Sequence, residues 1–93
     1  MVNIKTIEIV IRGNIIEKNI IWKLGQRLRD SKLQADFSST IMVPPFIKAY
    51  ERDFPSLAIL YGTVVLEELF QFKALVEEVC ASEDVEVITL REL

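Results

Sequence analysis

Histidine is absent from this 93-residue chain, and cysteine occurs once, as Cys80. Without histidine the chain lacks the most common general base, the Ser–His and Cys–His nucleophile pairs, and the histidine ligands of many metal sites. One cysteine can form neither an intrachain disulfide nor a thiolate zinc site. The sequence therefore favours a protein without catalytic residues, cofactor or metal, although it does not decide the question of enzymatic activity.

Glycine is also scarce, and its three positions are too far apart for a phosphate-binding loop or a dinucleotide-binding fingerprint. Adjacent carboxylates such as Glu67 and Glu68 point in different directions on a helix, which is typical of a solvated acidic surface rather than a metal site. Cys80 has the helical spacing of a core position, where a lone cysteine is most often a small buried hydrophobic residue.

Long apolar runs are missing as well. No run approaches the roughly 20 residues that cross a bilayer, and the N-terminal residues lack the features of a signal peptide. We therefore expect a soluble, cytoplasmic protein that forms a single domain over residues 1–93. Hydrophobic residues make up 51% of the chain, which is more than so small an interior can hold, so some apolar surface is expected to contact a partner.

Charge is unevenly distributed, although the net charge is only −3. Residues 12–32 contain six basic and two acidic side chains, whereas residues 51–93 contain three basic and ten acidic ones. The favoured interpretation is pairing between a basic first helix and an acidic second helix. The alternative is that the chain binds a small anionic ligand or nucleic acid through Arg12, Lys18, Arg27 and Arg29.

The first half of the chain predicts a strand followed by a helix. Residues 4–12 alternate between apolar and polar side chains, which indicates a strand with one buried face. Asn14 and Glu17 fit a capping-box pattern, so a helix is expected to begin directly after Gly13. The apolar stripe of this helix is formed by Ile16, Ile20, Ile21, Leu24 and Leu28.

The second half predicts three further elements and one ambiguous segment. Residues 37–43 favour a strand, whereas residues 45–54 fit a short helix and a strand about equally well. Residues 56–61 are apolar on both faces, which is typical of a strand inside a sheet, and this strand is expected to end at the following glycine. Residues 64–81 predict a second helix, and residues 85–90 predict a last strand.

This order of elements predicts an α+β two-layer sandwich of the split βαβ, ferredoxin-like kind, with two helices on one face of a four-stranded sheet. The alternative is a short, mostly parallel α/β sheet with a third helix at 45–54. RNA-recognition motifs share the first arrangement and stack bases on aromatic rings of the sheet. Because the first strand has Val10 at such a place and the third has only Tyr61, nucleic-acid binding is possible but not favoured.

A two-layer fold leaves one face of its sheet open, and the apolar residues of strand 56–61 that do not face the core are expected to lie there. The last strand is expected to add either Val85 and Val87 or Ile88 and Leu90. On the helices, Trp22 and Phe70 lie outside the apolar stripes, so Trp22 is covered either by segment 33–55 or by a partner. The predicted interface residues are Val10, Trp22, Leu57, Ile59, Tyr61 and Phe70.

These observations favour a non-enzymatic protein-interaction or regulatory module that forms homo-oligomers through an apolar sheet face. No membrane contact is expected.

Overall fold

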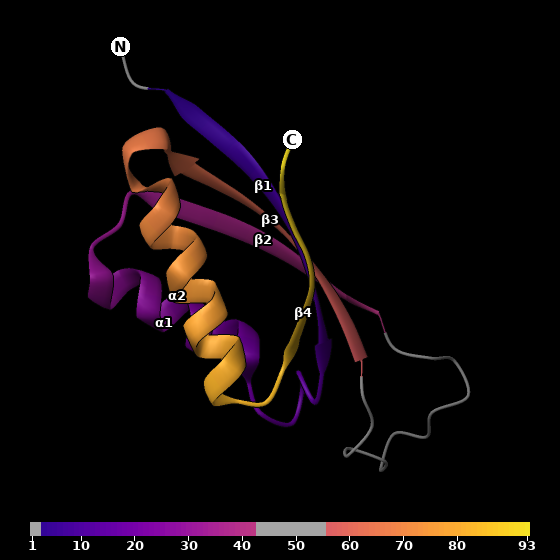
Figure 1. The fold of residues 1–93 in the computed structure, drawn as a ribbon. Helices are drawn as coiled ribbons and strands as arrows, with labels where there is room; N and C mark the ends of the chain where they lie inside the picture. Colours follow the sequence, from indigo (N-terminus) through magenta and orange to yellow (C-terminus); the bar gives the residue numbers. More distant parts are fainter. Residues whose placement is uncertain (1–2, 43–55) are drawn as a thin grey trace.

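The computed structural model describes residues 3–42 and 56–93 (Figure 1). Its elements in chain order are β1 (Ile4–Gly13), α1 (Ile20–Ser31), β2 (Ala35–Met42), β3 (Ser56–Val65), the 3₁₀ helix η1 (Leu66–Glu68), α2 (Leu69–Ser82) and β4 (Glu86–Glu92).

The strands form one four-stranded sheet in the order β2-β3-β1-β4, and each neighbouring pair is antiparallel. Both helices pack on the same face of this sheet (Figure 1). The predicted ferredoxin-like α+β sandwich is therefore confirmed, and the mostly parallel alternative is wrong. The ambiguous segment 45–54 lies outside the described residues.

The core lies between the sheet and the helices and is almost entirely aliphatic. Alternate residues of β1 enter it, namely Ile7, Ile9 and Ile11, each 1% exposed or less. The helices contribute the apolar side chains that cover them: Ile20, Leu24, Leu28, Phe72, Leu75, Val76, Val79 and Cys80. Within residues 3–42 and 56–93, neither helix has the length and apolar character needed to cross a membrane.

The predicted capping box is wrong, because Asn14 and Glu17 lie in a turn segment and α1 begins only at Ile20. The turns bury Ile15, which is 1% exposed, and leave Ile16 46% exposed, the reverse of the predicted stripe. After β1 the chain must rise from the sheet to the helix layer, and the turns carry Ile15 into the core between them. This packing outweighs the local preference for an earlier helix start.

Strand β3 is longer than predicted, because it continues through Gly62 to Val65. Gly62 does not form a turn; it makes room for the ring of Phe72, whose Cζ lies 3.0 Å from the position of a Cβ built on the glycine. A glycine inside a strand often marks such a close approach. The second helix starts correspondingly later than predicted, at Leu69 after η1.

Strand β4 contains an irregularity that the sequence pattern did not reveal. The register against β1 shifts between Val10 and Ile11, which leaves Ile88 without an opposed residue. This β-bulge lets Val87 and Leu90 both pack against the core, although they are three residues apart. Neither apolar pair predicted for the open face occupies it; the β4 residues paired with outward-facing residues of β1 are Glu86, Thr89 and Arg91.

Gly62→Ala is expected to lower the free energy of unfolding by about 1–3 kcal/mol, because the added methyl group meets the buried ring of Phe72. Denaturation by guanidinium, followed by circular dichroism, measures this change. The matched control is Gly25→Ala in α1, where the nearest atom to the added Cβ is Phe37 Cζ at 4.0 Å. That variant should gain up to about 1 kcal/mol from helix propensity. Equal stability of Gly62→Ala and wild type would contradict the close approach.

Candidate functional site

The side of the sheet turned away from the helices is called the open face. At its centre Val10 of β1 lies directly opposite Ile59 of β3, and Leu57 and Tyr61 flank Ile59 along the same strand. These four residues form the apolar cluster. The first three are partly buried and Tyr61 is 45% exposed. The structure thus brings four of the six predicted interface residues together.

Hydroxyl side chains border the apolar cluster on both sides. Thr40 of β2 lies opposite Ile59, and Thr89 of β4 lies opposite Val10, so one row across the sheet contains two aliphatic residues between two threonines. An apolar centre with a polar rim is the usual composition of a protein interface. The open face is therefore more polar at its edges than the sequence predicted.

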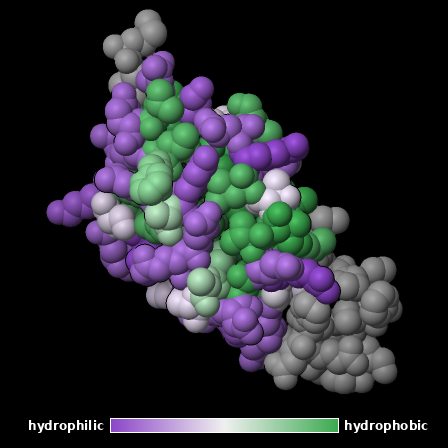
Figure 2. Space-filling view, in the orientation of Figure 1, coloured by the Kyte–Doolittle hydropathy of each residue, from purple (hydrophilic) through white to green (hydrophobic). Residues whose placement is uncertain are grey.

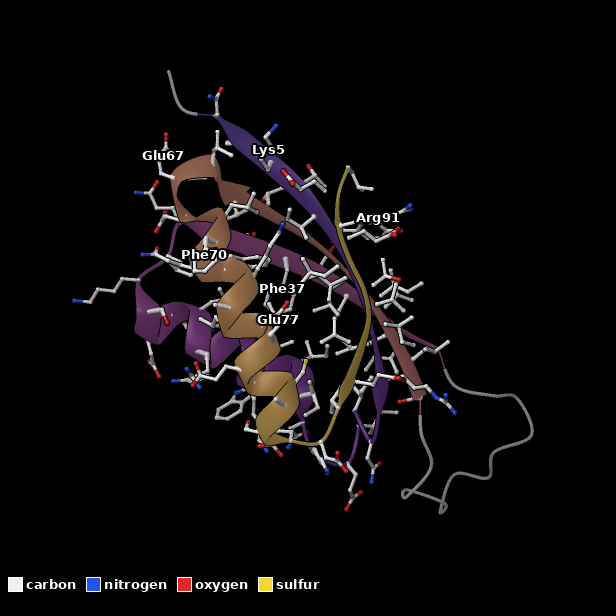
Figure 3. The ribbon with its side chains drawn as sticks, in the orientation of Figure 1. Lys5, Phe37, Glu67, Phe70, Glu77 and Arg91 are labelled. Atoms are coloured by element: carbon white, nitrogen blue, oxygen red, sulfur yellow. The ribbon has the colours of Figure 1, made fainter. Side chains whose placement is uncertain are left out.

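A polar network joins three side chains on this face. Glu8 accepts hydrogen bonds from the Tyr61 hydroxyl at 3.2 Å and from Arg91 Nε at 2.7 Å. Its side chain is only 17% exposed, so the carboxylate is largely enclosed by its two donors. Arg91 extends from β4 on the side away from the helices (Figure 3).

A second pair of opposite charges lies in the same row as Leu57, where Arg12 of β1 is opposite Glu86 of β4. Both residues are exposed. The sequence prediction did not include Glu8, Glu86 or Arg91 among the interface residues. The alternation of β1 already placed Glu8 beside Val10 and Arg12, but the two β4 residues depend on the bulge.

The remaining predicted interface residues, Trp22 and Phe70, lie in the helix layer. They are 63% and 81% exposed, and Phe70 projects from the outer side of α2 (Figure 3). The described part of segment 33–55 does not cover Trp22, because residues 35–42 form β2 in the sheet. A single flat contact on the open face cannot include these two rings.

An exposed hydrophobic side chain also occurs on β4. Figure 2 shows green, hydrophobic atoms gathered along β4 and beside it, among purple, hydrophilic ones. Ile88 at the bulge is 49% exposed. A contact that covers the edge of β4 as well as the open face would bury this residue too.

The two helices are joined by the charge pairing that the sequence favoured. Lys23 Nζ lies 2.8 Å from Glu83 Oε1, and Arg27 Nη2 lies 2.9 Å from Glu78 Oε1. Both pairs are partly exposed, so each is expected to contribute at most about 1 kcal/mol. The uneven charge distribution of the sequence thus has an explanation within the chain.

The residues of the alternative anion-binding hypothesis are not brought to one surface. Arg12 lies on the open face, whereas Lys18 donates to the backbone carbonyl of Glu83 at 2.6 Å on the helix side. Arg29 donates to the side chain of Gln26 at 2.7 Å, and Arg27 is paired as described above. Anion or nucleic-acid binding stays a prediction without a common surface to support it.

A hollow of about 380 Å³ lies between the helices, with apolar lining from Leu33, Ala74 and Leu75. Its charged lining residues, Arg27 and Glu78, are already paired with each other. Over the described parts of the chain, no three histidine, cysteine, aspartate or glutamate side chains cluster in a way that could hold a metal ion.

Cys80 is fully buried in α2 and packs in the core. Burial raises the pKa of its thiol from 9.0 to about 11, because the thiolate would lose its hydration. The thiolate is the reactive form of cysteine. The position therefore fits the structural role that the sequence predicted.

The architecture defines the chain as a ferredoxin-like α+β sandwich. No family model matches its sequence, and no curated protein is significantly similar to it. Among solved structures it is similar to "De novo designed protein Foldit4", with a TM-score of 0.66 and 12% sequence identity, over 98% of this chain and 97% of that one. At this identity the similarity concerns the fold alone.

The Cys80 thiol is expected to react with a thiol reagent in the folded protein at least about tenfold more slowly than in the unfolded chain at the same pH. The raised pKa lowers the thiolate fraction, and burial also keeps the reagent away from the sulfur. Absorbance of the released chromophore at neutral pH measures both rates. Equal rates would show that the thiol is accessible and ionises normally.

The same residue should make stability depend on pH. Its thiol stays protonated in the folded state between pH 9 and about 11, whereas it ionises in the unfolded state. The free energy of unfolding should therefore be unaffected below this range and fall as the pH rises through it. Cys80→Ala should lack this component, so parallel curves for the variant and the wild type would contradict it.

Proposed function

We propose that this chain is a non-enzymatic protein-interaction or regulatory module that forms a homodimer through the open face of its sheet. The observation that carries the proposal is the apolar cluster of Val10, Leu57, Ile59 and Tyr61, contiguous across β1 and β3 and partly exposed. Among residues 3–42 and 56–93, both helices lie on the other side of the sheet, so no helix layer covers this side. Packing two such sheets face to face is a common way to cover them.

A cluster of four partly exposed residues favours a weak rather than a permanent dimer. If the two copies together bury on the order of 400 Å² of apolar surface, the gain is about 10 kcal/mol. Association itself costs about 4–15 kcal/mol in lost freedom of the two molecules. The two terms nearly cancel, so the polar side chains around the cluster decide whether and how the copies associate.

The rim charges favour a second copy of this chain over a strongly charged partner. Arg12 and Arg91 carry positive charge on the open face, and Glu8, Glu86 and, on β2, Asp36 carry negative charge. A face that carries both signs can be complementary to itself, as a two-fold symmetric interface requires. A wild-type chain that stays monomeric in the experiment below would argue against a second copy and leave the face to a partner of different sequence.

Ile59→Glu is expected to weaken self-association by at least about thirtyfold, because it places a carboxylate at the centre of the interface, where losses of about 2 kcal/mol are typical. Sedimentation velocity over a wide range of concentrations measures the dimer dissociation constant. The matched control is Phe70→Glu, which makes the same kind of change in the helix layer and should leave association unchanged.

Two results would contradict the proposal. If the wild-type chain remains monomeric at about 1 mM, its association is favourable by less than about 4 kcal/mol of free energy, and the proposed dimer does not form. A chain whose association is lost in Phe70→Glu but kept in Ile59→Glu would place the contact on the helices instead of the sheet.

A further inference from the structure

Four charged residues of the open face lie in two rows, one on each side of the row of Val10 and Ile59. In one row Arg12 of β1 is opposite Glu86 of β4, and in the other Glu8 of β1 is opposite Arg91 of β4. The middle row, between them, contains Val10. In the Arg12 row the positive charge lies on β1, whereas in the Glu8 row it lies on β4. The order of the signs is therefore reversed across the middle row.

This reversal depends on the bulge in β4. Glu86 and Arg91 are five residues apart, so a regular strand would direct their side chains to opposite faces of the sheet. The extra residue, Ile88, shifts the later part of β4 by one position, so that Glu86 and Arg91 both lie opposite outward-facing residues of β1. The irregularity thus completes the charge pattern on the open face.

The reversed pattern makes this face complementary to a second copy of itself. Two copies whose open faces meet can be related by a two-fold axis. This axis lies between the two sheets, perpendicular to the strands and above the row of Val10. It places Arg12 over Glu8 of the second copy. It also places Glu86 over Arg91 of the second copy, and symmetry forms each contact twice. The same rotation stacks Ile59 on its own counterpart, so the apolar clusters cover each other.

An axis parallel to the strands does not achieve both effects. Placed between β1 and β4, it sets Arg12 over the second copy's Glu86, but β3 and most of the apolar cluster then lie beyond the edge of the opposite sheet. Placed between β1 and β3, it covers the cluster, but it sets Arg12 over Leu57 and Glu8 over Tyr61. Of these three arrangements, the axis across the strands alone combines charge pairing with apolar burial.

We infer that the two copies meet with their two-fold axis across the strands, over the row of Val10 and Ile59. Contacts of Arg12 with Glu8 and of Glu86 with Arg91 between the copies set their register. This inference rests on the proposed homodimer and specifies its geometry. Aligned sheets pack with their strands within about 30° of each other, which keeps these rows in register. Complementary charges mainly give such an interface its specificity.

Exchanging the charges of one row tests this geometry. The double variant Arg12→Glu with Glu86→Arg keeps the pair within the chain and the net charge, but it sets like charges over Glu8 and Arg91 of the second copy. Sedimentation velocity at low salt should show dimerisation at least about tenfold weaker, or about 1.4 kcal/mol. In 1 M NaCl, where the Debye length is about 3 Å, the difference from wild type should shrink.

The complementary exchange provides the matched variant. Glu8→Arg with Arg91→Glu should also weaken self-association, and it further loses the hydrogen bond from Tyr61. Mixed in equal amounts, the two double variants should form a heterodimer, because each presents the charges that the other lacks. The quadruple variant that combines both exchanges should self-associate again. Circular dichroism confirms that each variant is folded.

The outcomes separate this inference from the proposed function. If Ile59→Glu abolishes association while the Arg12-row exchange leaves the dissociation constant unchanged, the axis is wrong and the sheet-face dimer stands. If the two double variants fail to form a heterodimer, the charge register is likewise wrong. If the wild-type chain is monomeric, both fail together. Heterodimer formation by two variants that do not self-associate supports the inferred axis.

Discussion

The structure depends on the pairing of β1 between β3 and β4. A strand directs successive side chains to opposite faces of its sheet, so this one central strand supplies both the core and the open face. Ile7, Ile9 and Ile11 are buried beneath the helices, whereas the residues between them lie on the other side. A slip of one residue would exchange the two sets, and burial of three isoleucines makes such a slip costly.

The helix layer is held mainly by packing and only secondarily by charge. Phe72 reaches the backbone of β3 because Gly62 has no side chain in its way. The ion pairs of Lys23 with Glu83 and of Arg27 with Glu78 join α1 to α2, but their exposure limits what each contributes. The opposite charges of the two helices therefore favour their adjacent packing without being its principal cause.

On the open face the relation between apolar and charged residues is different. In the proposed dimer, the gain from burying its apolar cluster and the cost of association would be of similar size. The charged rows then gain importance, because they distinguish one way of packing two sheets from another. A dimer of this kind would respond to salt and to changes in its rim.

The sequence was sufficient for the features that depend on local periodicity. The alternation of residues 4–12 predicted a strand with one buried face, and the order of elements predicted the sandwich. The apolar stripe of α1 from Ile20 onward was also correct. For the candidate site, the same alternation placed Val10 on the open face, and the two apolar faces of strand 56–61 required one apolar set, predicted as Leu57, Ile59 and Tyr61, to lie there too.

The tertiary structure decided the features that depend on contacts between distant residues. Ile15 rather than Ile16 enters the core, Gly62 accommodates a ring instead of forming a turn, and Ile88 forms a bulge. Each outcome depends on a packing or pairing partner elsewhere in the chain, so a local pattern carries no signal for it. The charge pattern of the open face also depends on a contact between distant residues. Only the pairing of β4 with β1 through the bulge brings Glu86 and Arg91 opposite Arg12 and Glu8.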